Sequence, residues 1–154
     1  MPERDDDVVD ALAYLTRLVD HEISSVGISA GNVDGLTLEP TTRVLDALGR
    51  PDQSYRIVHI TGTNGKGSVA RMVEALIATT GLRPGSYLSP EGTVNERIRI
   101  DGHPIDDASL ADAVSSVRGV AGHLDVSLTA FEAVTLSALV AFADAPVDVA
   151  VVEV

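Results

Sequence analysis

The chain has 154 residues and a mass of 16.1 kDa, which is enough for one ordinary domain. Its contents of 45% hydrophobic and 22% charged residues are those of a globular protein and exclude extensive disorder. The formal net charge of −12 argues against nucleic acid or an anionic membrane as a partner. Because the chain has no cysteine, disulfides, thiolate metal sites and cysteine nucleophiles are excluded.

The first residues are acidic, whereas a secretory signal peptide begins with basic residues. No stretch reaches the roughly 18 apolar residues of a membrane span. We therefore expect a cytoplasmic protein, with an acidic tail at residues 1–7 and a folded part at residues 8–154.

The first third of the folded part is predicted to form two helices and a connecting loop. Apolar residues from Val8 to Val19 recur at helical spacing, whereas residues 23–39 are rich in Gly, Ser and Asn and predict a loop. A second helix is predicted over residues 40–49, since Pro40 suits a first helical position and Gly49 a helix end.

The middle of the chain has a strand–helix–strand pattern. Residues 56–61 predict a strand, in which His59 is expected to lie in the core. A glycine-rich segment follows, then a helix with its apolar stripe at residues 69–77, and a second strand at residues 84–89. This order is typical of a parallel sheet with right-handed crossovers.

The last third adds a hairpin, two helices and a strand. The turn Asp101-Gly102 predicts a hairpin over residues 97–105, with Arg97 and Arg99 solvated on one face. Helices are expected over residues 107–118 and 129–143, and a buried strand over residues 147–154. That strand has no turn or polar tail after it, which favours a chain cut in mid-fold over a natural C-terminal strand. The predicted fold is α/β, a mostly parallel sheet with flanking helices.

The glycine-rich segment carries the chemistry. A strand-to-helix loop with glycines offers backbone N–H groups to phosphates, a lysine adds positive charge, and a hydroxyl can reach Mg²⁺. The only lysine of the chain, Lys66, lies in this loop. The spacing differs from the usual phosphate-binding loop, since Gly67 separates Lys66 from Ser68. We nevertheless expect an ATP-binding loop made of Gly62, Thr63, Asn64, Gly65, Lys66, Gly67 and Ser68.

The string TGTNGKGS at residues 61–68 resembles the ATP loop of the Mur ligase superfamily, and specifically of folylpolyglutamate synthase and dihydrofolate synthase. Four further segments are similar to that family and occur in its order: residues 35–39, Leu88-Ser89-Pro90 with residues 95–100, Leu128 to Glu132, and residues 147–154. The resemblance covers nearly the whole chain from about residue 10, and it matches only the N-terminal part of the family's ATPase domain.

The resemblance implies an ATP-dependent ligase that joins L-glutamate to a folate or dihydropteroate carboxylate through an acyl phosphate. It implies ATP and Mg²⁺ as cofactors, Lys66 as the catalytic contact to the triphosphate, and Ser89 and Glu153 as Mg²⁺ ligands. It also implies a pterin-binding wall made of Gly35, Leu36, Thr129, Ala130, Phe131 and Glu132. Without the family's C-terminal half, these 154 residues are not expected to complete the reaction.

Several alternatives remain open from the sequence. Thr129 and Glu132 have the spacing of a helix capping box, which needs no substrate. Glu91 stands where the family has histidine, which adds a negative charge near the expected triphosphate. Another Mur-type amide ligase, or a truncated module that binds a nucleotide without catalysis, would share the same loop.

Overall fold

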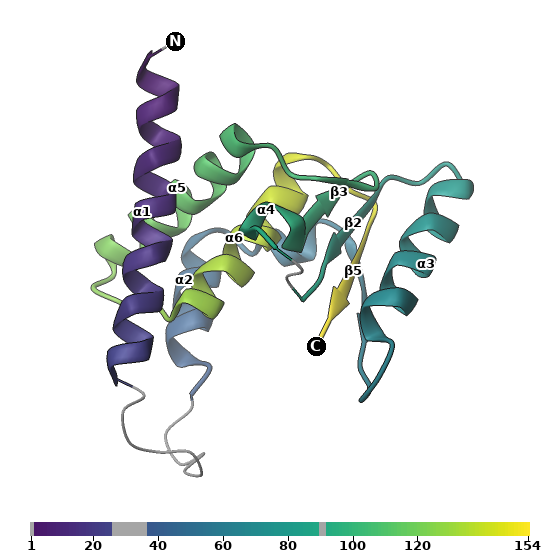
Figure 1. The fold of residues 1–154 in the computed structure, drawn as a ribbon, viewed down its shortest axis with the longest axis horizontal. Coiled ribbons are helices and arrows are strands. Elements are labelled where there is room, and N and C mark those ends of the chain that lie inside the picture. The colour runs from purple at the N-terminus through teal and green to yellow at the C-terminus, as the bar shows by residue number, and fades with distance from the viewer. Residues whose placement is uncertain (1, 26–36, 90–91) are drawn as a thin grey trace.

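The computed structural model describes residues 2–25, 37–89 and 92–154 (Figure 1). Gly35 and Leu36, which the sequence places in the pterin-binding wall, lie outside the described residues, and so does Glu91.

A mixed sheet occupies the centre, with the strand order β1-β5-β2-β3-β4. Its parallel part consists of β1 (Arg56–Ile60), β5 (Val149–Glu153) and β2 (Pro84–Tyr87). The predicted hairpin forms the antiparallel part, β3 (Ile98–Ile100) and β4 (His103–Pro104). Since β5 is last in the chain but lies between β1 and β2, the earlier strands depend on it to form one sheet.

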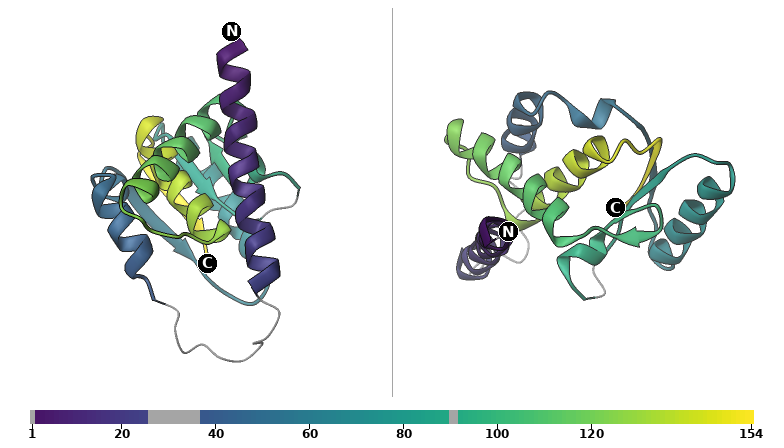
Figure 2. Two further views of the ribbon diagram at one scale, coloured as in Figure 1. Left: turned by 90° about the vertical axis from the view of Figure 1, so that its left-hand side faces the viewer. Right: turned by 90° about the horizontal axis from the view of Figure 1, so that it is seen from above.

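Helices cover both faces of the sheet (Figures 1 and 2). Among the described residues, α3 (Lys66–Thr79) is the helix on one face, and α6 (Ala130–Asp144) packs on the other. Behind α6 lie α1 (Pro2–Ser25), α2 (Glu39–Ala47) and α5 (Asp107–His123). The predicted α/β class with helices on both faces is therefore confirmed. Two short helical segments, η1 (Pro51–Gln53) and α4 (Val94–Arg97), lie in regions where the sequence indicated no regular structure.

The main core lies between the sheet and α6. Phe142 and Leu136 of α6 and Ile98 of β3 are completely buried. Phe142 lies so close to β2 that a Cβ atom at Gly85 would come within 2.7 Å of its ring. Tyr55 meets the same ring edge-on, with 5.9 Å between centroids, and donates its hydroxyl hydrogen to the Leu139 carbonyl.

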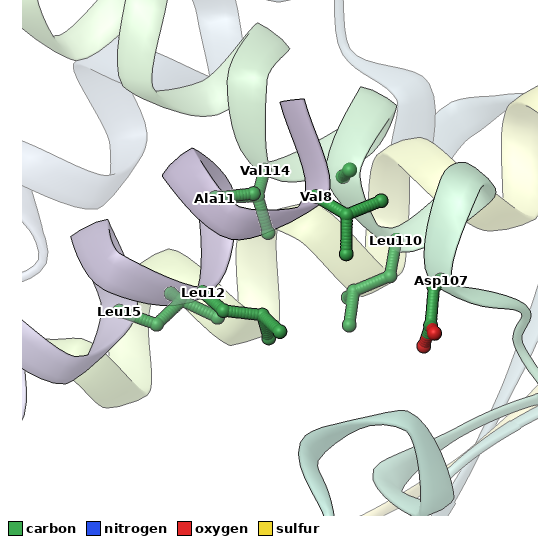
Figure 3. A pocket seen from close by; sticks show the side chains of 8 residues that line it. Val8, Ala11, Leu12, Leu15, Asp107, Leu110 and Val114 are labelled. Atoms are coloured by element: carbon green, nitrogen blue, oxygen red, sulfur yellow. The ribbon is translucent and has the colours of Figure 1, made fainter. Parts of the chain in front are cut away.

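The helix α1 is longer than its apolar stripe predicts. It begins at Pro2, so that residues 2–7, expected as an acidic tail, form its first turns. Its side chains Val8, Ala11, Leu12 and Leu15 face Leu110 and Val114 of α5 (Figure 3). These side chains leave no space for a water molecule between the two helices, so this contact is packing between helices rather than a binding site.

Only part of the apolar stripe of α3 is buried against the sheet. Ala70 is buried, and Val73 and Ile77 pack near it, but Met72 and Leu76 are each 65% exposed on the outer face. The prediction of a core position for His59 is wrong, because β1 is an edge strand and the side chain is exposed. Within the described residues, no helix combines the length and hydrophobicity that crossing a bilayer requires.

Candidate nucleotide and metal site

The three parallel strands end at one edge of the sheet, and the candidate site lies there. Ile60 at the end of β1 is in register with Glu153 at the end of β5, and Tyr87 of β2 is in register with Val152. The segments that follow β1 and β2 therefore meet the end of β5. The carboxyl edge of parallel strands is where ligand sites of such sheets usually lie.

The loop after β1 has the backbone shape that its glycines predict. Gly62 and Gly65 have φ angles of 150° and 74°, which glycine adopts without a steric penalty. Gly65 is the N-cap residue of α3, and its carbonyl accepts a hydrogen bond from the N–H of Val69 at 2.9 Å. Lys66 is the first residue of the helix, so the loop places the only lysine beside N–H groups that a phosphate can use.

A pocket of about 370 Å³ opens at this loop and contains most of the predicted ATP-binding residues. Its lining consists of Thr63, Asn64, Gly65, Lys66, Gly67, Ser68, Arg71, Leu88, Ser89 and Glu153. Gly62 lies just before this lining. The site predicted from the sequence does not include Arg71, and it includes Leu88 only as part of the segment Leu88-Ser89-Pro90 that is similar to the family. Arg71 had a readable signal, because it follows Ser68 by three residues on the same helix and so shares its face.

Ser89 and Glu153, 64 positions apart in the chain, are in direct contact. The Ser89 hydroxyl donates to Oε1 of Glu153 at 2.8 Å, and the Ser89 N–H donates to Oε2 at 3.4 Å. The loop reaches the same carboxylate, since a Cβ at Gly67 would lie only 3.3 Å from Oε2. The missing side chain of Gly67 thus leaves room for Glu153 beside the phosphate-binding loop.

The donor set at this point fits Mg²⁺. A hydroxyl and a carboxylate are hard oxygen donors, and Mg²⁺ usually takes few protein ligands and retains several waters. Among the described residues, no group of three or more His, Asp or Glu side chains could hold a metal ion. Ser89 and Glu153 together offer two such oxygen donors, which could hold Mg²⁺ with phosphate oxygens and water completing its shell.

The segment from Thr129 to Glu132 opens α6 as a capping box. The Thr129 hydroxyl accepts from the Glu132 N–H at 3.1 Å, and the Glu132 carboxylate accepts from the Thr129 N–H at 2.8 Å. Thr41 of α2 donates its hydroxyl hydrogen to the same carboxylate at 2.7 Å. The capping box that the spacing of Thr129 and Glu132 indicates is therefore present, and the bond from Thr41 additionally joins α2 to α6.

The surroundings of Glu132 favour its charged form. Burial raises the pKa of this carboxyl, but hydrogen bonds from the Thr129 N–H and from the hydroxyls of Thr41 and Thr129 outweigh burial. The resulting pKa of Glu132 lies below its ordinary value.

Phe131 and Ala130 differ in exposure although they are neighbours. Ala130 is buried, whereas Phe131 is 60% exposed, contrary to the burial that its helix predicts. The Phe131 ring lies 5.8 Å from the guanidinium carbon of Arg97, which also lies 5.1 Å from the Tyr87 ring. Arg97 is thus not a freely solvated strand residue. The segment from Thr129 to Glu132 is not part of the pocket lining at the loop.

The chain is similar to enzymes of folate metabolism. It is 42% identical over 130 residues to the dihydrofolate synthase/folylpolyglutamate synthase of Mycobacterium tuberculosis, a match that covers 77% of this chain and 27% of that protein. The structure of folylpolyglutamate synthase from Thermotoga maritima matches with a TM-score of 0.78 and 35% identity, over 96% of this chain and 32% of that one.

A third match holds ligands. The structure of Escherichia coli FolC in complex with DHPP and ADP matches with a TM-score of 0.76 and 30% identity, over 94% of this chain and 33% of that one. No general protein-family profile matches the chain. The chain spans about a quarter (27%) of the length of this Mycobacterium tuberculosis protein and of the folylpolyglutamate synthase of Lacticaseibacillus casei, to which it is 44% identical over 117 residues. By its sequence and its fold, the chain belongs to the folylpolyglutamate synthase/dihydrofolate synthase family.

Proposed function

We propose that the chain is the ATP- and pterin-binding portion of a ligase that joins L-glutamate to a folate or dihydropteroate carboxylate. In this reaction ATP phosphorylates the carboxylate to an acyl phosphate. The glutamate amino group then attacks the acyl carbon, and phosphate leaves; ADP is the other product. The observation that carries the proposal is the contact of Ser89 with Glu153 beside the loop of Lys66. The relatives support the nucleotide, since solved structures hold ADP and AMPPCP.

Each part of the site has a defined task in this proposal. The N–H groups of the loop and the Lys66 ammonium bind the β- and γ-phosphates and orient the γ-phosphate. Ser89 and Glu153 hold Mg²⁺, which supplies neutralisation of phosphate charge when bound. Thr129, Ala130, Phe131 and Glu132, with Gly35 and Leu36, are proposed to form the wall that binds the pterin. We place the protein in the cytoplasm.

Calorimetric titration of the chain with Mg-ATP tests the proposal. We expect saturable binding that weakens roughly ten- to hundredfold in Lys66→Ala, because a hydrogen bond to a charged group is lost. Arg118→Ala, a change on α5 away from the loop, is the matched control and should bind as the unchanged chain does. Absence of binding in a chain whose circular dichroism shows it to be folded would contradict the proposal.

A second titration tests the metal ligands. Ser89→Ala and Glu153→Gln should each reduce the dependence of ATP binding on Mg²⁺, whereas binding of ATP without the metal should change little. A Mg²⁺ dependence that is the same in both variants and in the unchanged chain would remove the pair from the site.

A further inference from the structure

The Phe131 ring stands at the surface, in the first turn of α6, where neighbouring helix turns give it little packing. An exposed aromatic side chain ordinarily changes rotamer freely. Here the ring is in reach of a guanidinium, since the central carbon of Arg97 lies 5.8 Å from the ring centre. A cation over an aromatic face is attracted by the electrons of the ring.

Arg97 is itself held in place on two sides. Its carbonyl accepts a hydrogen bond from the N–H of Leu88 at 2.9 Å, and its guanidinium carbon lies 5.1 Å from the ring centre of Tyr87. Its Nε is buried and has no hydrogen-bond partner in the described part of the chain. Stacking on aromatic rings, rather than hydrogen bonding of Nε, therefore fixes the orientation of the guanidinium.

Tyr87 connects Arg97 to α6. It is 96% buried in β2, and its hydroxyl lies 3.1 Å from the hydroxyl of Thr135 in α6. Thr135 follows Phe131 by four residues, so the two share one face of the helix. The cluster of Tyr87, Arg97, Phe131 and Thr135 consequently links β2, α4 and α6. It adjoins the metal-site segment, because Ser89 follows Tyr87 by two residues.

We propose that Arg97 is a positioning residue that holds the Phe131 ring outward, as a stacking face for the flat pteridine ring of a pteroate-type substrate. The inference rests on the proposed function and adds to it a residue outside the predicted pterin-binding wall. The guanidinium occupies one side of the ring and leaves another side exposed. Because the ring is ordered before the ligand arrives, binding loses less side-chain entropy.

Fluorine NMR tests, without any ligand, whether Arg97 positions the Phe131 ring. The chain has two phenylalanines, so 4-fluorophenylalanine labelling gives one signal from Phe131 and one from the buried Phe142. In Arg97→Met, which keeps the aliphatic stem, we expect the Phe131 signal to narrow and move toward that of the free amino acid. The Phe142 signal should stay in place. An unchanged Phe131 signal would overturn the proposal.

Controls separate this effect from unfolding. Arg118→Met removes a similar contact elsewhere, since the guanidinium carbon of Arg118 lies 6.0 Å from the ring of Tyr14, and it should move neither signal. If Arg97→Met does not fold, Arg97→Lys retains the charge without the flat group. A Phe131 signal that moves in that variant while the Phe142 signal stays supports the proposal, and one that does not move contradicts it.

Binding measurements test the substrate. Affinity for pteroate should fall roughly three- to tenfold in Arg97→Met, the cost of ordering one side chain at binding. Affinity for p-aminobenzoylglutamate, which lacks the pteridine ring, and for Mg-ATP should stay unchanged. Equal losses for both folate-type probes would overturn a role at the pteridine. If the unchanged chain binds Mg-ATP but not pteroate, the pterin part of the proposed function fails, and the fluorine signals still decide whether Arg97 holds Phe131.

Discussion

At the scale of single residues, glycine is required at two positions because a side chain there would come too close to a neighbouring residue. The Cβ that Gly67 lacks would approach Glu153, and the Cβ that Gly85 lacks would overlap the Phe142 ring. The first position lies in the candidate site and the second in the core. The same substitution is therefore expected to change binding at one position and stability at the other.

Gly67→Ala should weaken Mg²⁺-dependent ATP binding and leave the free energy of unfolding nearly unchanged. The added methyl group would lie 3.3 Å from Oε2 of Glu153, at the flexible end of that side chain, and would displace the carboxylate. We expect roughly a tenfold loss, the smaller effect of changing the surroundings of a metal ligand. Calorimetry with Mg-ATP measures it. Gly119→Ala is the control, because a Cβ there meets nothing within 4 Å.

Gly85→Ala should destabilise the fold by about 1–3 kcal/mol, the usual cost of overpacking a core. The new Cβ would lie 2.7 Å from Cδ1 of Phe142, a completely buried ring that has no space to move away. Urea denaturation gives the change. Adding Phe142→Leu to Gly85→Ala should cost less than the two separate effects combined, and strict additivity would contradict the clash.

At the scale of elements, the start of α6 combines a structural role with the proposed binding role of Phe131. Thr129 and Glu132 cap the helix, while Phe131 between them presents its ring to the surface. The hydrogen bond from Thr41 extends the cap to α2. The cap therefore fixes the backbone that carries Phe131, so a loss of capping should affect both stability and substrate binding.

Glu132→Gln should lower the free energy of unfolding by roughly 0.3–1 kcal/mol at neutral pH, because the amide keeps an acceptor for the Thr129 N–H but loses the negative charge at the N-terminus of α6. The folded-state pKa of Glu132 is depressed, so the stability that its charge contributes is present above the unfolded pKa and is lost as the pH falls through the folded pKa. Urea denaturation at several pH values should show the unchanged chain and the variant converging in acid. A difference that is the same at every pH would contradict this assignment.

At the scale of the whole molecule, apolar side chains are exposed on α3 and along the edge strand β1. Met72 and Leu76 are each 65% exposed, and Ile57 and Val58 of β1 are more than one third exposed. An edge strand also presents unpaired backbone groups. Met72 and Leu76 follow each other by four residues and share one face of α3, and such a pair of exposed apolar side chains favours association with another chain or segment.

Sedimentation over a range of concentrations tests this expectation. Met72→Glu combined with Leu76→Glu should weaken self-association of the chain roughly tenfold, because burial of both apolar side chains is lost. Leu38→Glu is the control, since Leu38 is 79% exposed but lies at the start of α2, on the other side of the sheet. Equal weakening by the control would contradict a role for α3.

Features that depend on residues close together in the sequence are predicted correctly. The glycine loop, the strand–helix–strand unit and the helix end at Gly49 depend on neighbours within a few residues, and each is found as predicted. The lengths of the helices are predicted less accurately from the sequence. The helix α1 begins in an acidic segment with no apolar stripe, and α4 is a single turn that no periodicity can indicate.

The sequence by itself determined the α/β class, the loop of Lys66 and, through resemblance, the pairing of Ser89 with Glu153. Those features rest on backbone preference and on motifs a few residues long. Only the tertiary structure decided which apolar residues are buried. Because β5 enters the sheet between β1 and β2, β1 becomes an edge strand of the described sheet, and its apolar side chains and those on the outer side of α3 stay exposed. It alone brought Arg97 between Tyr87 and Phe131, since those rings come from elements more than forty residues apart and meet only when α6 packs on the sheet.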